Sequence, residues 1–404
     1  MDFALSPEHQ RLQQRCRELA ADFAARSAAH DRDASHPVEN YERLRCEGFC
    51  ALNVPKAWGG AGVGLLGHTL AFEALAEGCP ATALAFNMHA SVVMPVLESA
   101  EVAPEKKRHL ARLVVEERKL IAGNFSEAST TSLIGARPLA TRARRANGGY
   151  CITGRKMFAS MLEAADYCLV MAAPEGVAGP SPGVMLLVPR NAAGRRVEAN
   201  WDTLGMRATR SDSLILEDCW VPESAALFCS DDIGPFRQAH LNWFWGSYTA
   251  VYLGVASAAY REILRVVGSR RPEGYAQPLA CHPDVRRQVA EMSVDLEAAR
   301  LLTYHSAWLS DIKGPTAETT AALYRAKYRV GEAATRITRT ALTLGGAHAI
   351  FKGSRLEQLF RDGALAPIQP PPADFCLYNV GLFELGLDPA DLLPPLKPQS
   401  GGGA

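Results

Sequence analysis

The sequence has no excess of charge of either sign and no long apolar run. Its 404 residues include 43 basic and 43 acidic side chains, so the formal net charge is zero. A neutral chain is not expected to bind nucleic acid or an anionic membrane through charge alone. No run of about 18 purely apolar residues is present, and a transmembrane helix is therefore not predicted. The N-terminus lacks the basic and apolar regions of a signal peptide, which favours a cytoplasmic protein.

The sequence also lacks the motifs of several enzyme classes. It contains no GxSxG elbow, no Walker A loop, no HExxH helix and no protein-kinase set, which disfavours serine hydrolysis, P-loop phosphoryl transfer and zinc-peptidase chemistry. The ten cysteines include no CxxC pair, so we expect buried thiols and no metal site.

One glycine-rich segment matches a dinucleotide-binding motif but has a simpler explanation. The segment 62–67 matches GxGxxG and follows a strand-like run, Cys50–Val54. However, seven residues separate the two, and no repeated βαβ pattern follows. A turn between two helices therefore explains these glycines better than a dinucleotide site does.

The hydrophobic pattern divides the chain into three parts and a tail. Helical periodicity occupies residues 1–119, short apolar runs separated by glycine and proline occupy 120–232, and helical periodicity returns over 233–390. Residues 391–404 are rich in proline, glycine and serine, which is typical of a flexible tail. The predicted fold class is α+β, with an N-terminal helical domain, a central antiparallel β domain and a C-terminal four-helix bundle.

Two long helices are predicted in the last part, over 283–312 and 316–344. The second has a C-terminal stop at Gly345-Gly346 and an apolar stripe on one side. We expect this stripe to join copies of the chain, although it could also pack only inside its own bundle. Its members are Leu323, Val330, Ala334, Ile337, Ala341 and Leu344.

Two features carry candidate chemistry. The segment 124–132 is rich in hydroxyl side chains and opens the β domain, so it is either a surface loop or a cradle for a flat heterocycle and phosphates. His89 lies among Phe86, Met88 and Val92, where a histidine is either a satisfied core residue or a catalytic group.

Seven segments in one order resemble the acyl-CoA dehydrogenase superfamily. Residues 54–62 resemble its VPxxxGGxG signature, 124–132 its flavin-binding TEPxxGS segment and 154–160 its GxKxWIT strand. The remaining matches are Leu204–Arg207, Asp218–Pro222, Gly345-Gly346 and Arg361-Asp362. The resemblance covers nearly the whole chain, and the order makes it specific.

The resemblance implies a bound FAD between the β domain and the bundle. Phe158 stands where the family has a tryptophan that shields the flavin ring, and Ser160 where a threonine bonds it. Ser132 falls on the serine that binds the pyrophosphate. A neighbouring subunit completes the flavin site in this family, which implies a homodimer or homotetramer. The cofactor-binding residues implied are Phe125, Ser126, Ser132, Phe158, Ser160, Gly345 and Gly346.

The implied reaction is αβ-dehydrogenation of an acyl thioester, bound to CoA or a carrier protein, with an electron-acceptor flavoprotein as partner. It needs a carboxylate to remove the α-proton. The family's usual glutamate is missing from the loop after Arg361-Asp362, and residues 237–254 contain no Asp or Glu. Asp374 is the only carboxylate in that loop, so it is the candidate base. Its alternative role is the N-cap of a helix over 375–385.

A member without the base suggests two other functions. The same fold hosts flavin monooxygenases that use reduced FAD or FMN, O2 and a flavin reductase, and they need a sheltered flavin hydroperoxide instead of a base. Residues 251–256 and His89 resemble the sulfur-oxygenating members. The third alternative is a non-catalytic subunit of a heteromeric dehydrogenase.

Overall fold

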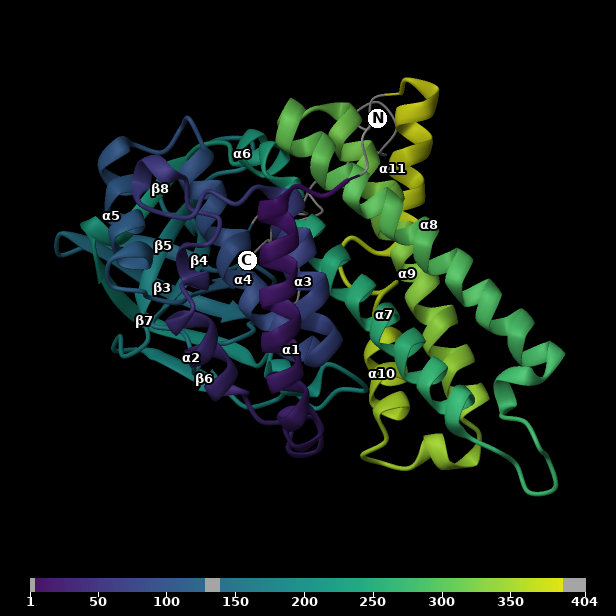
Figure 1. Ribbon diagram of the computed structural model, residues 1–404. Coiled ribbons are helices and arrows are strands. Elements are labelled where there is room, and N and C mark those ends of the chain that lie inside the picture. The colour runs from purple at the N-terminus through teal and green to yellow at the C-terminus, as the bar shows by residue number, and fades with distance from the viewer. Residues whose placement is uncertain (1–3, 128–138, 388–404) are drawn as a thin grey trace, which may run out of the picture.

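The computed structural model describes residues 4–127 and 139–387 and confirms the predicted order of a helical domain, a β domain and a helical bundle (Figure 1). The N-terminal helices are α1 Pro7–Asp33, α2 Val38–Cys46, α3 Leu65–Gly78, α4 Pro80–Glu98 and α5 Pro104–Val115. The long apolar helix α4 contacts three of the other N-terminal helices, α2, α3 and α5, as well as the sheet and the C-terminal bundle. Among the described residues, α4 alone is long and apolar enough to cross a membrane, and it is buried completely within the protein.

The central domain is a sheet of eight strands in the described part of the chain. The strands are β1 Ile121–Asn124, β2 Arg142–Ala146, β3 Gly149–Lys156, β4 Tyr167–Pro174, β5 Gly183–Pro189, β6 Arg195–Glu198, β7 Ser213–Pro222 and β8 Ala226–Ser230. Their order is β6-β7-β3-β2-β4-β5-β8, with β1 beside β4. The pairings are antiparallel as predicted, except that β1 and β2 both run parallel to β4.

The C-terminal bundle lies on the other side of α1 and α3 from the sheet (Figure 1). It follows a short helix, α6 Gly234–Ala239, and a π-helical turn, Asn242–Gly246. The bundle helices are α7 Ser247–Ser269, α8 Pro283–Lys313, α9 Ala317–Gly345, α10 Arg355–Gly363 and α11 Ala373–Leu385. Thr316 caps α9 through its side chain, and Gly346 ends it with φ +69°.

The apolar stripe of α9 does not form an exposed surface. Leu323, Val330 and Ile337 are at most 2% exposed, because α9 packs against α7, α8, α10 and α11 of its own chain. The expectation that this stripe joins copies of the chain is therefore wrong, and its alternative, packing inside its own bundle, is confirmed.

The strand-like run 50–54 is not a strand. Residues Phe49–Ala51 form a 3-10 turn, and α3 begins at Leu65, so the first two glycines of the GxGxxG match precede the helix and Gly67 lies within it. The chain from 51 to 63 doubles back on itself, since the amide of Ala61 donates to the carbonyl of Ala51 at 3.0 Å and the amide of Val63 donates to the carbonyl of Leu52 at 3.0 Å. These residues therefore make a turn between two helical segments, as predicted from the missing βαβ pattern.

Candidate functional site

Four of the predicted flavin-binding residues lie on two neighbouring segments of the β domain. Phe125 and Ser126 follow β1, whereas Phe158 and Ser160 follow β3. The amide of Met157 donates to the carbonyl of Ser126 at 2.9 Å and so joins the two segments. The structure thus brings together, where β1 and β3 end, residues that are more than 30 positions apart in the sequence.

Phe158 has an unusual backbone and an exposed ring. Its φ is +54°, a left-handed conformation that is rare for a large side chain, and 60% of the side chain is exposed. The next residue, Ala159, donates its amide to the carbonyl of Asp212 at 3.1 Å and fixes the turn. Trp201 lies edge-on to the Phe158 ring, with 6.1 Å between the ring centroids. Conformations of this kind persist where the surrounding structure imposes them, and they are concentrated at ligand sites.

Phe125 does not share this exposure. Its side chain is 8% exposed and meets Phe244 of the π-helical turn at 6.0 Å, nearly perpendicular. Phe125 therefore connects the candidate site to the start of the bundle. Turns of π-helix are common at functional sites.

Behind Ser160 lies a chain of three hydroxyl groups that the sequence did not reveal. Ser160 Oγ is 2.7 Å from Ser211 Oγ, which is 2.9 Å from Thr209 Oγ1. Thr209 Oγ1 donates to the carbonyl of Met206 at 2.9 Å. All three hydroxyl residues are buried.

Glu127 and Lys156 form a buried ion pair beside the candidate site. Their side chains are 1% and 0% exposed, and Lys156 Nζ donates to Glu127 Oε1 at 2.5 Å. The carboxylate also accepts the amides of Ala140 and Thr141 at 2.6 and 3.0 Å. Although burial opposes ionisation, the Lys156 charge and these hydrogen bonds lower the pKa of Glu127 to about 2. Glu127 therefore joins the end of β1 to residues 140 and 141 and to the end of β3.

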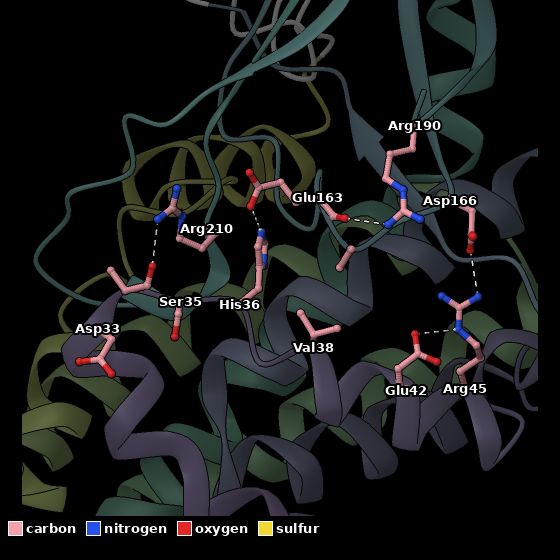
Figure 2. A pocket seen from close by; sticks show the side chains of 12 residues that line it. Asp33, Ser35, His36, Val38, Glu42, Arg45, Glu163, Asp166, Arg190 and Arg210 are labelled. Carbon is pink, nitrogen blue, oxygen red and sulfur yellow. Dashed lines mark hydrogen bonds and ion pairs between the residues drawn. The ribbon is translucent and has the colours of Figure 1, made fainter. Parts of the chain in front are cut away.

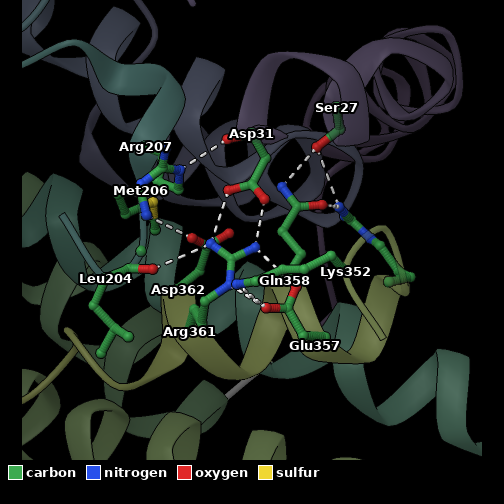
Figure 3. Close-up of polar contacts among 12 residues, drawn as sticks. Ser27, Asp31, Leu204, Met206, Arg207, Lys352, Glu357, Gln358, Arg361 and Asp362 are labelled. Atoms are coloured by element: carbon green, nitrogen blue, oxygen red, sulfur yellow. Dashed lines mark hydrogen bonds and ion pairs between the residues drawn. The ribbon is translucent and has the colours of Figure 1, made fainter. Parts of the chain in front are cut away.

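Arg361 and Asp362 anchor the loop Leu204–Arg207, as Figure 3 shows. The guanidinium of Arg361 is paired with Asp31 of α1 and Glu357 of α10. Asp362 accepts the amide of Met206 at 2.6 Å and is 1% exposed; burial raises its pKa to about 7. Both residues therefore hold the loop that carries the far end of the hydroxyl chain, and neither side chain is open to a substrate.

The same loop needs a glycine where it meets α10. A β-carbon on Gly205 would lie 2.3 Å from the carbonyl oxygen of Arg361, which is closer than atoms can approach. The carbonyl of Leu204 also accepts a hydrogen bond from Arg361 Nη1 at 3.1 Å. The sequence match at Leu204–Arg207 thus reflects a close backbone contact.

His89 is buried, and both of its ring nitrogens are hydrogen-bonded to the backbone of other segments. It is 3% exposed; the amide of Ile121 donates to Nδ1 at 3.0 Å, and Nε2 donates to the carbonyl of Cys50 at 2.9 Å. Burial lowers its pKa to about 4, so the ring is neutral near pH 7. Both nitrogens are used in joining α4 to two other segments, which favours the core alternative over the catalytic one.

Asp374 lies in the first turn of α11 and is exposed. The N-cap position belongs to Pro372, and no side chain caps this helix, so the alternative role of Asp374 as N-cap is wrong. The preceding loop leads from α10 across α7, where Tyr252 donates to Gln369 Oε1 at 2.5 Å. The role of Asp374 as a base stays a prediction.

Gly345 and Gly346 lie at the end of the bundle, where Arg270 Nη1 donates to the carbonyl of Gly345 at 3.0 Å. They would meet a flavin only from a neighbouring chain, and that contact stays a prediction. Ser132 lies outside the described residues.

A separate cavity of about 630 Å³ opens between the α1–α2 connection and the loop that carries Glu163 and Asp166 (Figure 2). Its charged groups are largely paired with each other, for example Arg45 with Asp166 at 2.9 Å. None of the predicted flavin-binding residues lines it. We therefore place the candidate site at Phe158 and Ser160.

Comparison with known proteins identifies the family of the chain. Residues 6–117, 125–219 and 237–369 match the family models for the N-terminal, middle and C-terminal domains of acyl-CoA dehydrogenases. The putative acyl-CoA dehydrogenase YdbM of Bacillus subtilis is 30% identical over 90% of this chain and 93% of its own.

Solved structures with the same fold include two different activities. A glutaryl-coenzyme A dehydrogenase complex superimposes with a TM-score of 0.84 at 23% identity, over 96% of this chain and 98% of its own. The methanesulfinate monooxygenase MsuC of Pseudomonas fluorescens gives a TM-score of 0.81 at 22% identity, over 97% and 98%. These likenesses show the fold alone, whereas the family models cover most of the sequence: the chain belongs to the acyl-CoA dehydrogenase family.

Proposed function

We propose that the chain is an FAD-dependent dehydrogenase that introduces an αβ double bond into an acyl thioester. The observation that carries the proposal is the left-handed turn at Phe158, which exposes an aromatic ring next to the buried hydroxyl of Ser160. A flat ring with hydrogen-bonding edges, such as a flavin, fits this pair. The relatives named acyl-CoA dehydrogenases support the acyl thioester as the substrate class.

Each residue has a defined task in this proposal. The ring of Phe158 covers one face of the flavin, while Ser126 and Ser160 hydrogen-bond its edge. When bound, the flavin supplies hydride acceptance from the β-carbon. Asp374 removes the α-proton, and an electron-acceptor flavoprotein is the proposed partner for reoxidation. We place the enzyme in the cytoplasm.

One observation favours a second candidate function, a flavin monooxygenase. Neither residues 237–254 nor residues 363–373 contain an Asp or Glu. The first of these segments reaches the candidate site, since Phe244 contacts Phe125. A monooxygenase needs no α-carbon base. It would take reduced FMN or FAD from a flavin reductase.

Anaerobic spectroscopy separates the two candidates. We expect the purified protein to be yellow and its visible flavin band to bleach when a series of acyl-CoA thioesters is added without O2. If no thioester bleaches the band, the protein should next be reduced with dithionite and mixed with O2. A long-lived oxygen-adduct spectrum would then support the monooxygenase function and contradict the dehydrogenase function. A colourless protein that ignores added FAD and FMN would contradict both.

We also propose that copies of the chain associate through the outer face of α8. Val294, Leu301 and Trp308 recur every seven residues and are 67%, 47% and 39% exposed. Together with the intervening positions they follow the alternating four-three spacing of a helix seam. The full set is Val294, Ala298, Leu301, His305, Trp308 and Ile312. Figure 1 shows α8 on the outside of the bundle, so a second copy can reach this face.

Charged substitutions on this face should yield monomers. Leu301→Glu combined with Trp308→Glu would place two carboxylates on each side of the seam. Hot-spot residues at the centre of an interface cost about 2 kcal/mol or more when lost, and tryptophan is a frequent hot spot, so the dimer or tetramer should dissociate in sedimentation runs. Ser293→Glu adds a charge beside the seam and should leave the assembly intact. A wild-type monomer with full flavin occupancy would contradict the proposal.

A further inference from the structure

The chain of hydroxyl groups behind Ser160 can point its hydrogens in either of two directions. In one, Ser160 donates to Ser211, Ser211 to Thr209, and Thr209 to the carbonyl of Met206. In the other, every hydrogen turns round and Ser160 donates away from the chain. A hydroxyl group has one hydrogen, so the direction at one end fixes the direction at the other.

The Met206 carbonyl determines which of the two directions is more stable. It also accepts the amide of Thr209 and Nε1 of Trp201, both at 3.1 Å. The carbonyl is therefore satisfied in both directions, and reversal leaves no buried polar group without a partner. The inward direction makes one more hydrogen bond, from Thr209 Oγ1. It is the preferred direction, and it leaves the Ser160 oxygen as an acceptor.

A flavin ring changes its own hydrogen-bonding role with its oxidation state. Nitrogen N5 of the oxidised ring is an acceptor. Two-electron reduction places a hydrogen on N5, and the nitrogen then becomes a donor. A group beside N5 that prefers to accept stabilises the reduced state, whereas a group that can only donate favours the oxidised state.

We propose that Ser211 and Thr209 are positioning residues that make Ser160 a hydrogen-bond acceptor toward the flavin and thereby raise the reduction potential of the cofactor. This inference rests on the proposed function, because it requires a flavin beside Phe158 whose N5 faces the hydroxyl of Ser160. Neither Ser211 nor Thr209 needs to touch the cofactor. Both act through the hydroxyl of Ser160.

Removing either hydroxyl should make the flavin harder to reduce. In Ser211→Ala, Ser160 loses its inward acceptor and its hydrogen turns toward the flavin. In Thr209→Val, the hydrogen of Ser211 loses its acceptor, so the inward direction is again disfavoured. We expect about a tenfold change in the equilibrium between the two oxidation states, which corresponds to a midpoint potential about 30 mV more negative for a two-electron couple.

The test is the midpoint potential of the FAD-loaded protein, measured by anaerobic dithionite titration against a reference dye. Thr209→Ser keeps the hydroxyl and should keep the wild-type potential. Ser213→Ala is the matched control. Ser213 is also a buried serine and lies two residues after Ser211, but its hydroxyl is hydrogen-bonded to Asn200 and Arg155 and not to the hydroxyl chain. For a variant that binds FAD weakly, the same change in midpoint potential can be obtained from the dissociation constants of oxidised and reduced FAD.

The outcomes separate this inference from the proposed function. If FAD binds and Ser211→Ala or Thr209→Val keeps the wild-type potential or raises it, the hydroxyl chain has no such role, while the proposed function stands. If Ser160→Ala leaves both FAD affinity and potential unchanged, the flavin does not lie at Ser160, and the placement and this inference fail together. A wild type that binds no flavin refutes both.

Discussion

Lys156→Met is expected to lower the free energy of unfolding by about 3–5 kcal/mol, because it leaves the Glu127 carboxylate buried without its counter-charge. Both side chains are almost completely inaccessible, so water cannot replace the missing ammonium group. Urea unfolding at pH 7, followed by circular dichroism, measures the loss.

A neighbouring ion pair supplies the matched control. Arg155 is next to Lys156 on the same strand and pairs with Glu198, but both of these side chains are well exposed. Arg155→Met should therefore cost about 1 kcal/mol or less. The double variant Glu127→Gln with Lys156→Met should recover part of the loss, since the buried charge is gone and one oxygen still accepts an amide. Equal losses for Lys156→Met and Arg155→Met would contradict the importance of burial.

The pH dependence of the free energy of unfolding is an independent test of the Glu127–Lys156 pair. The pKa of Glu127 is lowered from its ordinary value to about 2, so its contribution to stability is fully present above about pH 4.5. It is lost as the pH falls toward 2, because the unfolded state binds the proton first. Lys156→Met removes the main source of the lowered pKa and should flatten the pH dependence in this window.

The second large effect concerns catalysis. We expect Asp374→Asn to slow the anaerobic bleaching of the flavin by acyl-CoA by about 10²–10⁴-fold, which is the usual contribution of a general base. The nearest earlier carboxylate, Asp362, is buried and accepts the amide of Met206, so it is not available to a substrate. Stopped-flow absorbance under argon measures the rate of bleaching.

The effect of Asp374→Asn on protein stability must be separated from its effect on the reaction rate. A negative charge in the first helical turn interacts favourably with the helix dipole, so Asp374→Asn should cost only about 0.3–1 kcal/mol. Glu384→Gln removes the same charge near the other end of α11, where Glu384 pairs with Arg325, and should keep the wild-type rate. A wild-type rate in Asp374→Asn would exclude Asp374 as the base without excluding dehydrogenation.

Local signals predicted the long helices well. The two glycines at 345 and 346 marked the C-terminal end of α9, because helix termination depends on neighbouring residues. The start of α11 was misplaced for a local reason too: Pro372, with its fixed φ, occupies the N-cap position and moves Asp374 into the first turn. Short segments were less certain, since the periodicity of the run 50–54 fits a strand or a turn equally well.

The contacts that form the candidate site depend on distant parts of the chain. Asp31 and Arg361 are 330 residues apart, and Ser160 and Ser211 are 51 apart. Residue types suggested a cofactor cradle, but no spacing rule connects a serine after β3 with a serine before β7. For the same reason the sequence singled out His89 as a candidate, whereas the structure shows its nitrogens bonded to the backbone of two other segments.

The position of Glu127 also links parts of the β domain that are separate in the sequence. It directly follows Phe125 and Ser126 of the candidate site, and its carboxylate accepts the amides of Ala140 and Thr141 just before β2. The same carboxylate accepts a hydrogen bond from Lys156 at the end of β3. Loss of this carboxylate would therefore loosen the candidate site and the sheet together, so that cofactor retention and domain stability depend on one side chain.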